Sequence, residues 1–177
     1  MAEKYILTGG PNSGKTTTLN ALKKEGFNVF DEAARIILED EMKNDKEVVT
    51  YKGNVEARQK KILQLQLKNE KRAENIKGAV FFDRGIPDGI VYYRLSKTKI
   101  PKSILLEAKR EKRNYNKVFI FDMLPYKTDS VRKEPEEIAK NIHQLVYEVY
   151  SELGYDIIRV PVMPVEVRVS FIKQKIL

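Results

Sequence analysis

The sequence predicts an α/β fold with a largely parallel sheet, and three observations lead to this class. Strand-like and helix-like segments alternate along the chain, which is the order that parallel strands and their crossover helices require. The run of Val80, Phe81 and Phe82 has no polar side, as expected for a strand that helices cover on both faces. A glycine-rich loop, residues 9 to 14, separates the first strand-like segment from the first helix-like one.

Chain length and composition favour one domain and exclude several kinds of chemistry. The 177 residues contain no repeat and no flexible linker, so we expect a single domain over residues 1–177. The absence of cysteine excludes disulfides, zinc-thiolate sites, iron-sulfur clusters and a cysteine nucleophile. The single histidine, His143, leaves almost no room for a histidine-built metal site, and we expect it at the surface or its boundary without a function. With no signal-peptide pattern and no membrane-length apolar run, we expect a soluble, cytoplasmic protein.

The first half of the chain contains three of the expected strands. They cover residues 4–8, 27–30 and 79–83, and helices cover 15 to about 25, a segment from 32 onward, and about 54 to 76. Gly26 is placed to end the first helix in a left-handed conformation. Asp31 is expected to cap the helix that Glu32 opens. Apolar residues at helical spacing, among them Ile62 and Leu65, predict the long third helix.

The second half continues the alternation. Helices are expected from Pro87, Pro101 and Pro135, strands over 117–122 and 155–160, and a polar loop over 123–133. Proline suits the first turn of a helix, and Gly154 is placed to stop the helix that follows Pro135. The tail from Pro164 fits both a strand and a helix. We expect a helix there, because the last strand of a parallel sheet needs a covering element.

The strongest functional motif is the glycine-rich loop. Residues 9 to 16 read G-G-P-N-S-G-K-T and satisfy G-x-x-x-x-G-K-[ST], the phosphate-binding loop, between a strand and a helix as that motif requires. Backbone N–H groups of such a loop surround phosphates, its lysine reaches the β- and γ-phosphates, and its threonine binds magnesium. The expected nucleotide-binding residues are Gly10, Pro11, Asn12, Ser13, Gly14, Lys15, Thr16 and Thr17.

A second motif follows the third strand, where Asp83 precedes Arg84. Ligands of open α/β sheets bind at the carboxyl ends of the strands, so Asp83 is expected to hold magnesium together with Thr16, directly or through water. Motor and transporter ATPases usually place a glutamate after this aspartate, whereas aspartate followed by arginine resembles nucleoside and nucleotide kinases, in which the arginine contacts phosphoryl groups. A helix cap, or a salt bridge between Asp83 and Arg84, is the structural alternative.

Two further features are candidates for catalysis. Glu32 stands where deoxynucleoside kinases place the glutamate that accepts the proton of the acceptor hydroxyl, although it could equally interact with a helix dipole. Glu32 and Asp83 both remain candidates for the base. The loop of about 123–134 lies where such kinases carry a lid, and Arg132, with Lys127 second, is expected to reach the transferred phosphoryl group. A solvated loop is the alternative reading.

Taken together, these motifs resemble one family. The motifs are G-G-P-N-S-G-K-T-T, D-E-A-A-R, F-D-R-G-I-P-D, Y-K-T-D-S-V-R-K-E and V-P-V-M-P-V-E-V-R. In this order they are similar to the compact AAA-type ATPase/kinase domain family that includes nicotinamide-riboside-kinase-like proteins and is related to nucleoside and nucleotide kinases. The resemblance implies a P-loop fold with five parallel strands in the order 2-3-1-4-5, nucleotide and Mg²⁺ binding, and a phosphotransferase or NTPase activity. It also implies that residues 160–164 border the adenine.

The function expected from the sequence is transfer of the γ-phosphoryl group of Mg-ATP to a small nucleoside- or nucleotide-like acceptor. One alternative is a slow NTPase switch that binds ATP or GTP and acts through a partner. Residues 127–129 resemble part of the GTPase motif N-K-x-D, but Tyr126 replaces its asparagine. Another alternative is a nucleic-acid-binding protein or polynucleotide kinase that uses the basic stretch 96–117. The net charge of +8 would suit nucleic acid or anionic lipid, although a solvated helix face explains it as well.

Overall fold

A computed structural model describes residues 2–43, 54–125 and 135–176 of the chain. Its strands are β1 (Ala2–Thr8), β2 (Asn28–Phe30), β3 (Gly78–Asp83), β4 (Tyr115–Phe121) and β5 (Ile157–Val160). Its helices are α1 (Lys15–Lys24), α2 (Ala33–Met42), α3 (Val55–Ala73), α4 (Pro87–Leu95), α5 (Lys102–Glu111), the short 3-10 helix η1 (Lys112–Asn114), α6 (Glu136–Glu152) and α7 (Val165–Ile176).

The five strands form one parallel sheet in the order β2-β3-β1-β4-β5, which confirms the expected order. The central strand β1 pairs with β3 on one side and with β4 on the other. Leu7 lies opposite both Asp83 and Phe119 in this register. The carboxyl ends of β1 and β3 are therefore adjacent, and this brings the glycine-rich loop next to Asp83.

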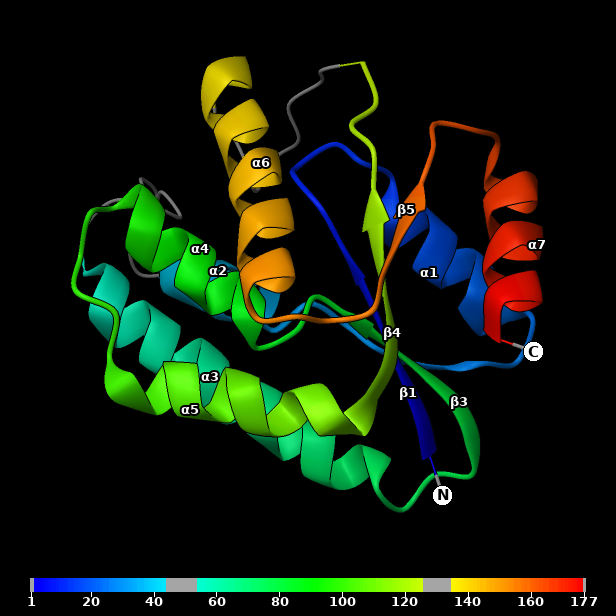
Figure 1. Cartoon of the computed structure of the whole chain (residues 1–177), viewed down its shortest axis with the longest axis horizontal. Coiled ribbons are helices and arrows are strands. Elements are labelled where there is room, and N and C mark those ends of the chain that lie inside the picture. Colours follow the sequence, from blue (N-terminus) through cyan, green and yellow to red (C-terminus); the bar gives the residue numbers. More distant parts are fainter. Residues whose placement is uncertain (1, 44–53, 126–134, 177) are drawn as a thin grey trace.

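Helices cover both faces of the sheet (Figure 1). On one face, Tyr5 and Leu7 of β1 pack in a core with residues of α1 and α7. On the other face, Ile6 packs in a core that α4, α5 and α6 complete, with Ala73 of α3. Alternate residues of each central strand are thus buried on opposite sides. This explains why the strands are continuous apolar runs in the sequence.

The ends of several elements differ from the expected ones. Asp31 was expected to cap the second helix, and this is wrong, because α2 begins at Ala33 with Glu32 at the capping position and no side-chain cap. Gly26 and Gly154 follow α1 and α6 with φ of +92° and +72°, as their predicted role as helix stops requires. The tail is helical, as expected. Most of the loop predicted to be a lid, residues 126–134, lies outside the described residues.

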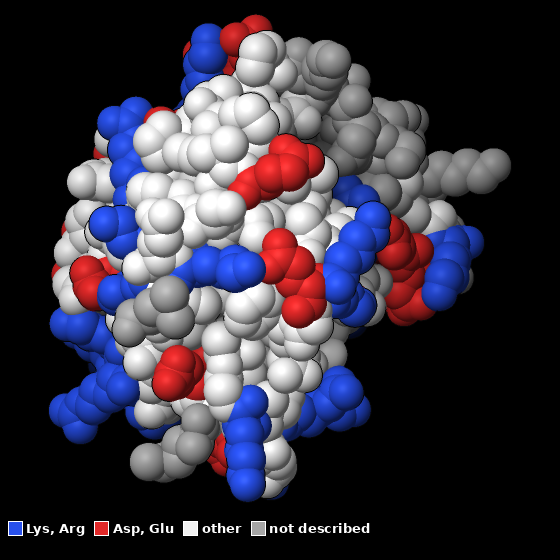
Figure 2. All heavy atoms as spheres, turned by 90° about the vertical axis from the view of Figure 1, so that its right-hand side faces the viewer, with Lys and Arg blue, Asp and Glu red and all other residues white. Residues whose placement is uncertain are grey.

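Charged side chains of both signs are interleaved on the face that α7 borders (Figure 2). Ion pairs join distant elements on the surface, for example Lys173 of α7 with Glu25 after α1, and Arg159 of β5 with Asp122 after β4, both at 2.7 Å. The positive net charge therefore does not form a single-sign field on this face. Within the described parts of the chain, no helix is both long enough and apolar enough to span a bilayer.

Candidate functional site

The glycine-rich loop, residues 9 to 14, leaves the end of β1 and enters α1 at Lys15. Its backbone bends through three residues of positive φ, namely Gly9 (134°), Asn12 (55°) and Gly14 (77°). Such bends point successive N–H groups to one side, and the first N–H groups of α1 have no acceptor within the helix. A Cβ atom at position 9 would lie 2.7 Å from the Phe121 carbonyl oxygen, so only glycine fits there. The loop has the shape and polarity of an anion-binding concavity.

Lys15 lies against the inside of this loop and is only 6% exposed. Its Nζ donates to the carbonyl oxygens of Gly9 and Gly10, at 3.2 and 2.8 Å, and to Ser13 Oγ at 2.9 Å. These acceptors are neutral, whereas phosphate oxygens are charged and form stronger hydrogen bonds with an ammonium group. The Lys15 side chain can therefore exchange loop carbonyls for phosphate oxygens with a gain in electrostatic energy.

Thr16 and Asp83, the pair expected to hold magnesium, meet at the mouth of the loop. Thr16 Oγ1 donates to Asp83 Oδ2 at 3.5 Å, and the carboxylate is buried at the end of β3. In the ranges 2–43, 54–125 and 135–176 no group of three or more His, Asp or Glu side chains could enclose a metal ion. One hydroxyl and one carboxylate suit Mg²⁺, which takes the rest of its shell from phosphates and water.

Arg84 joins the loop to Glu32. Its Nε donates to Glu32 Oε1 at 2.6 Å and its Nη1 to the Gly9 carbonyl oxygen at 3.1 Å. The guanidinium is 3% exposed, and its Nη2 has no hydrogen-bond partner among the described residues. Burial by itself lowers the pKa of Arg84, but the charges of Glu32, Asp88 and Asp83 outweigh it and raise the pKa well above its usual value. A fixed cation therefore stands beside the loop with one nitrogen able to take a further acceptor.

Asp88 holds Arg84 from the other side, a role that the sequence reading missed. Its carboxylate accepts from Arg84 Nη1 at 2.9 Å, from Thr8 Oγ1 at 2.6 Å, from the Gly85 N–H at 3.0 Å and from Tyr150 Oη at 2.7 Å. Four donors satisfy the lone pairs of one carboxylate. Arg84 itself has a φ of +70°, an uncommon backbone conformation that is often found at functional sites. In the sequence Asp88 ends the motif F-D-R-G-I-P-D, but no role was assigned to it.

Arg168 of α7 ends the motif V-P-V-M-P-V-E-V-R, but the sequence analysis gave it no role. It is 5% exposed, and its guanidinium donates to the carbonyl oxygens of Gly14 and Met163 at 3.2 and 2.7 Å and to Thr18 Oγ1 at 3.3 Å. Burial lowers its pKa, and among the described residues it has no salt-bridge partner. Arg168 thus connects two loops. One is the loop before α7, which was expected to border the adenine, and the other is the glycine-rich loop.

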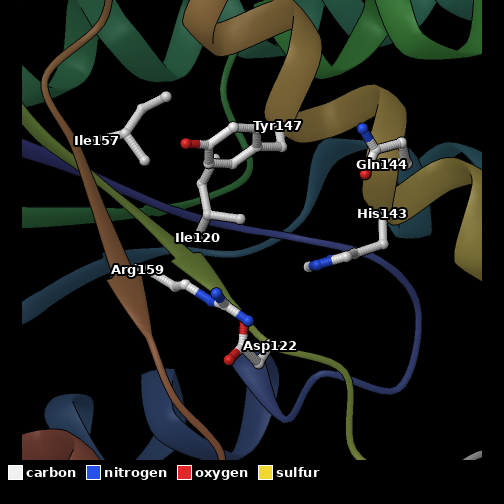
Figure 3. Close-up of a pocket in the computed structure, with 7 residues that line it drawn as sticks. All are labelled: Ile120, Asp122, His143, Gln144, Tyr147, Ile157 and Arg159. Carbon is white, nitrogen blue, oxygen red and sulfur yellow. The ribbon is translucent and has the colours of Figure 1, made fainter.

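His143 is half-buried, which agrees with the expected boundary position, and it also contacts the loop. The Gly10 N–H donates to its Nδ1 at 3.3 Å. The same imidazole lines a cavity of about 330 Å³ between α6 and the ends of β4 and β5. Figure 3 shows it pointing from α6 toward Asp122 and Arg159. No pattern marked His143, because a lone histidine among helix residues has no sequence signature.

The structure thus places Lys15, Thr16, Glu32, Asp83 and Arg84 around the end of β1. Each of the five contacts another residue of the set or the loop itself. The remaining loop residues of the expected binding set, Gly10 to Gly14 and Thr17, lie in the turn or the first turn of α1. Arg132 and Lys127 lie outside the described residues.

Comparison with protein families finds that a model described as an AAA domain matches residues 4–168. No curated protein sequence matches the chain. The match begins within β1, includes the glycine-rich loop and ends within α7.

Solved structures match over nearly the whole chain. A deoxyadenosine kinase from M. mycoides, solved with dCMP and dCDP, is 17% identical, with 97% of each chain covered and a TM-score of 0.62. The same enzyme with bound dATP is 19% identical, with 98% of each chain covered and a TM-score of 0.57. A NadR protein in complex with NAD and AMP-PNP is 16% identical with a TM-score of 0.67, and the match covers 98% of this chain and 49% of that one. The likeness is one of fold, and this chain spans about half of the NadR chain.

Proposed function

The chain belongs to the AAA domain family and has the fold of P-loop kinases, and from this premise we propose that it is an ATP-dependent kinase. The acceptor we propose is a small nucleoside- or nucleotide-like molecule that carries a hydroxyl or phosphate group. Kinase and NadR structures of the same fold contain nucleotides and dinucleotides, which supports an acceptor of this class. We also propose that residues 1–177 act as one domain.

Binding of Mg-ATP would rely on the glycine-rich loop and the first turn of α1. The N–H groups of residues 10 to 17 would surround the β- and γ-phosphates, and Lys15 Nζ would exchange its carbonyl acceptors for phosphate oxygens. Thr16 and Asp83 would hold Mg²⁺, which neutralises charge on the β- and γ-phosphates. GTP could occupy the same loop, since these contacts involve phosphates and not the base.

Transfer would rely on Arg84 and Glu32. The acceptor hydroxyl attacks the γ-phosphorus, its proton passes to a Glu32 oxygen, and ADP leaves with the electrons of the broken P–O bond. Arg84 Nη2 would donate to the oxygens of the transferred group as their charge develops. Glu32 suits the base better than Asp83, because Asp83 faces Thr16 on the magnesium side. The predicted contact of Arg132 with the same phosphoryl group lies outside the described residues.

One observation carries the choice of a kinase over a hydrolase. The position after Asp83 holds Arg84, which Glu32 and the Gly9 carbonyl oxygen fix beside the loop. A hydrolase of the motor type needs a carboxylate there to polarise water, and an arginine cannot accept a proton at any ordinary pH. Glu32 is the carboxylate that pairs with Arg84 Nε, and we assign it to the acceptor hydroxyl.

The experiment that tests this proposal is a panel of acceptors incubated with Mg-ATP. The panel includes nucleosides, nucleotides, nicotinamide riboside, RNA 5′ ends and lipids, and both the phosphorylated product and released phosphate are quantified. We expect transfer to one class of small acceptor at a rate far above hydrolysis. Hydrolysis alone would contradict the kinase and favour the NTPase switch, whereas transfer only to RNA ends would favour the polynucleotide kinase.

A further inference from the structure

Helix α6 presents two polar side chains to the site, and each contacts a different part of it. His143 and Tyr150 are seven residues apart, which is about two helical turns, so both lie on one face of α6. His143 contacts the glycine-rich loop at Gly10, and Tyr150 contacts Asp88 behind Arg84. One rigid element therefore touches both the part that would bind ATP and the part that would act on the transferred group.

The contact of His143 with the loop is close and specific. Because Nδ1 accepts the Gly10 N–H, it carries no proton, so the neutral imidazole has its proton on Nε2. A Cβ atom at position 10 would lie 2.8 Å from His143 Cβ and 3.1 Å from the Ala139 carbonyl oxygen. The loop thus lies directly on α6 at Gly10, with no room for water between them. His143 fixes the start of the loop by one hydrogen bond and by direct contact.

The contact of Tyr150 acts through a carboxylate. The Tyr150 hydroxyl donates to Asp88 Oδ2 at 2.7 Å, while Asp88 Oδ1 accepts from Arg84 Nη1 at 2.9 Å. Tyr150 is fully buried, and burial together with the charge of Asp88 raises its pKa well above the usual value, so the hydroxyl stays a donor. The Tyr150 hydroxyl fixes the Asp88 carboxylate, and this carboxylate fixes the Arg84 guanidinium. The Tyr150 contact therefore determines the direction in which Arg84 Nη2 points.

We propose that His143 and Tyr150 are positioning residues through which α6 sets the place of the glycine-rich loop relative to the Arg84 guanidinium. This inference rests on the proposed function, because it names what orients that same site. The two contacts should have separable effects. His143 acts on a loop that binds the phosphates in the ground state, so it governs ATP affinity. Tyr150 acts on Arg84, which serves the transferred group, so it governs turnover.

The first test compares His143→Leu with His143→Asn. Leucine removes the acceptor, whereas the Asn Oδ1 atom can occupy nearly the same place as the histidine Nδ1 and accept from Gly10. We expect Leu to weaken Mg-ATP binding roughly fivefold in calorimetric titrations, the worth of one hydrogen bond, with little change in saturated turnover. Asn should recover most of the affinity. The matched control is Gln144→Leu, since Gln144 is the adjacent residue and, within the part of the chain that the structure describes, its amide bonds only Glu148 on the same helix.

A spectroscopic reading of the wild-type protein accompanies this test. The single histidine gives one set of imidazole ¹⁵N resonances, so no assignment by mutation is needed. We expect the Nε2–H tautomer at pH 8, with a Gly10 amide proton signal that shifts in His143→Leu. A proton on Nδ1, or equal ATP affinities for wild type, Leu and Asn, would overturn the role of His143.

The second test is Tyr150→Phe, which removes only the hydroxyl group. We expect single-turnover phosphoryl transfer to fall roughly tenfold while ATP affinity stays unchanged, since Asp88 loses one of four donors and Arg84 its fixed direction. Tyr147→Phe is the matched control, because this hydroxyl is on the same helix but exposed. Thermal unfolding is measured for every variant. A lower melting temperature with normal turnover would show a structural role only and overturn the role of Tyr150.

These outcomes separate the inference from the proposed function. Wild-type protein that binds Mg-ATP but transfers to no acceptor would contradict the proposed function and overturn the Tyr150 half with it. The calorimetric and ¹⁵N measurements on His143 need no acceptor, so they still decide the other half. Normal transfer by the wild type, with wild-type ATP affinity in His143→Leu and wild-type turnover in Tyr150→Phe, would overturn the inference and leave the proposed function standing.

Discussion

Glu32 is the residue to which we assign the proton of the acceptor hydroxyl. Glutamine at this position keeps the size of the side chain and an oxygen for the Arg84 Nε, but it cannot accept a proton. We expect Glu32→Gln to lower single-turnover transfer by about 10² to 10⁴, the usual contribution of a general base, with ATP affinity nearly unchanged. Rapid-quench measurement of the transfer step checks this. Near-normal transfer in Glu32→Gln would move the role to Asp83.

Arg168 is a buried cation whose partners are two carbonyl oxygens and one hydroxyl. Methionine keeps much of the apolar stem and removes all of these hydrogen bonds. We expect Arg168→Met to cost roughly 1 to 3 kcal/mol in the free energy of unfolding and to weaken ATP binding, because the loop loses an anchor at Gly14. Urea unfolding and calorimetry measure the two effects.

The control for Arg168→Met is Lys173→Met on the same helix. Lys173 forms an exposed pair with Glu25, and such pairs contribute about 0 to 1 kcal/mol. Equal losses in the free energy of unfolding would show that the buried Arg168 contacts stabilise the fold no more than an exposed ion pair does.

Sequence reasoning assigned roles to residues of the glycine-rich loop and of the Asp83-Arg84 motif, and it assigned none to several side chains that contact them only in three dimensions. Lys15 and Thr16 could be predicted because the loop chemistry requires fixed spacing along the chain. Asp88 contacts Arg84 from α4, and His143 and Arg168 reach the loop from α6 and α7. Asp88 and Arg168 each end a quoted motif, but their spacing along the chain does not predict these contacts. Glu32 was predicted as a candidate base after the second strand, and its ion pair with Arg84 could not be read from sequence, because the pair spans 52 positions.

At the scale of the element, the glycine-rich loop depends on backbone conformations that only glycine adopts easily. Gly9 has a φ of +134°, and its missing Cβ would lie 2.7 Å from the Phe121 carbonyl oxygen of β4. We expect Gly9→Ala to destabilise the fold by about 1 to 3 kcal/mol from backbone strain, with the steric overlap as a further cost. Urea unfolding measures the change.

Gly26→Ala is the matched control for Gly9→Ala. Gly26 also has a positive φ, but a Cβ atom there would have no neighbour within 4 Å. The difference between the two variants in lost free energy of unfolding measures the contribution of the contact between the loop and β4. If both lost the same stability, strain alone would explain the effect and the close packing of loop and strand would be contradicted.

The elements themselves were predictable because each carries a local signal. Apolar runs identify β1, β3 and β4, and Gly26 and Gly154 end helices in the left-handed conformation that the sequence suggested. The end of α3 was placed three residues too late, at Ile76 and not Ala73, since Ile76 packs on the core after the helix has ended. Asp31 failed as a cap because α2 begins one residue later than predicted, which puts Glu32, the partner of Arg84, at the capping position.

At the scale of the molecule, binding of Mg-ATP should stabilise the folded state by mass action. At a nucleotide concentration of about 100 times Kd the gain is about 2.7 kcal/mol. For a chain of this size that corresponds to a rise in Tm of roughly 5 to 10 °C. Thermal unfolding with and without Mg-ATP measures the shift.

Lys15→Ala serves as the control for the thermal shift. The variant should unfold near the wild-type temperature without nucleotide and show no shift with it, because Lys15 contacts the loop and contributes little to the apolar core. An unchanged shift in Lys15→Ala would contradict the assignment of the loop as the nucleotide site.

The net charge of +8 also belongs to the scale of the molecule, and it did not identify the function. The most basic stretch, 96–117, covers α5 and η1, where Arg110 pairs with Glu107 and contacts Glu111. Such local pairing is typical of a solvated helix face. The residues that we propose to bind phosphate lie instead at the carboxyl end of the sheet, where open α/β folds bind their ligands.

The most direct measurement follows the γ-phosphoryl group itself through one turnover. Enzyme in excess is mixed with γ-labelled Mg-ATP and the acceptor found in the panel, and phosphorylated acceptor is separated from inorganic phosphate over time. We expect the label to appear in the acceptor, with little in inorganic phosphate, and no transfer by Lys15→Ala. Label that reached only inorganic phosphate, or ATP that bound and stayed intact with every acceptor, would contradict a kinase.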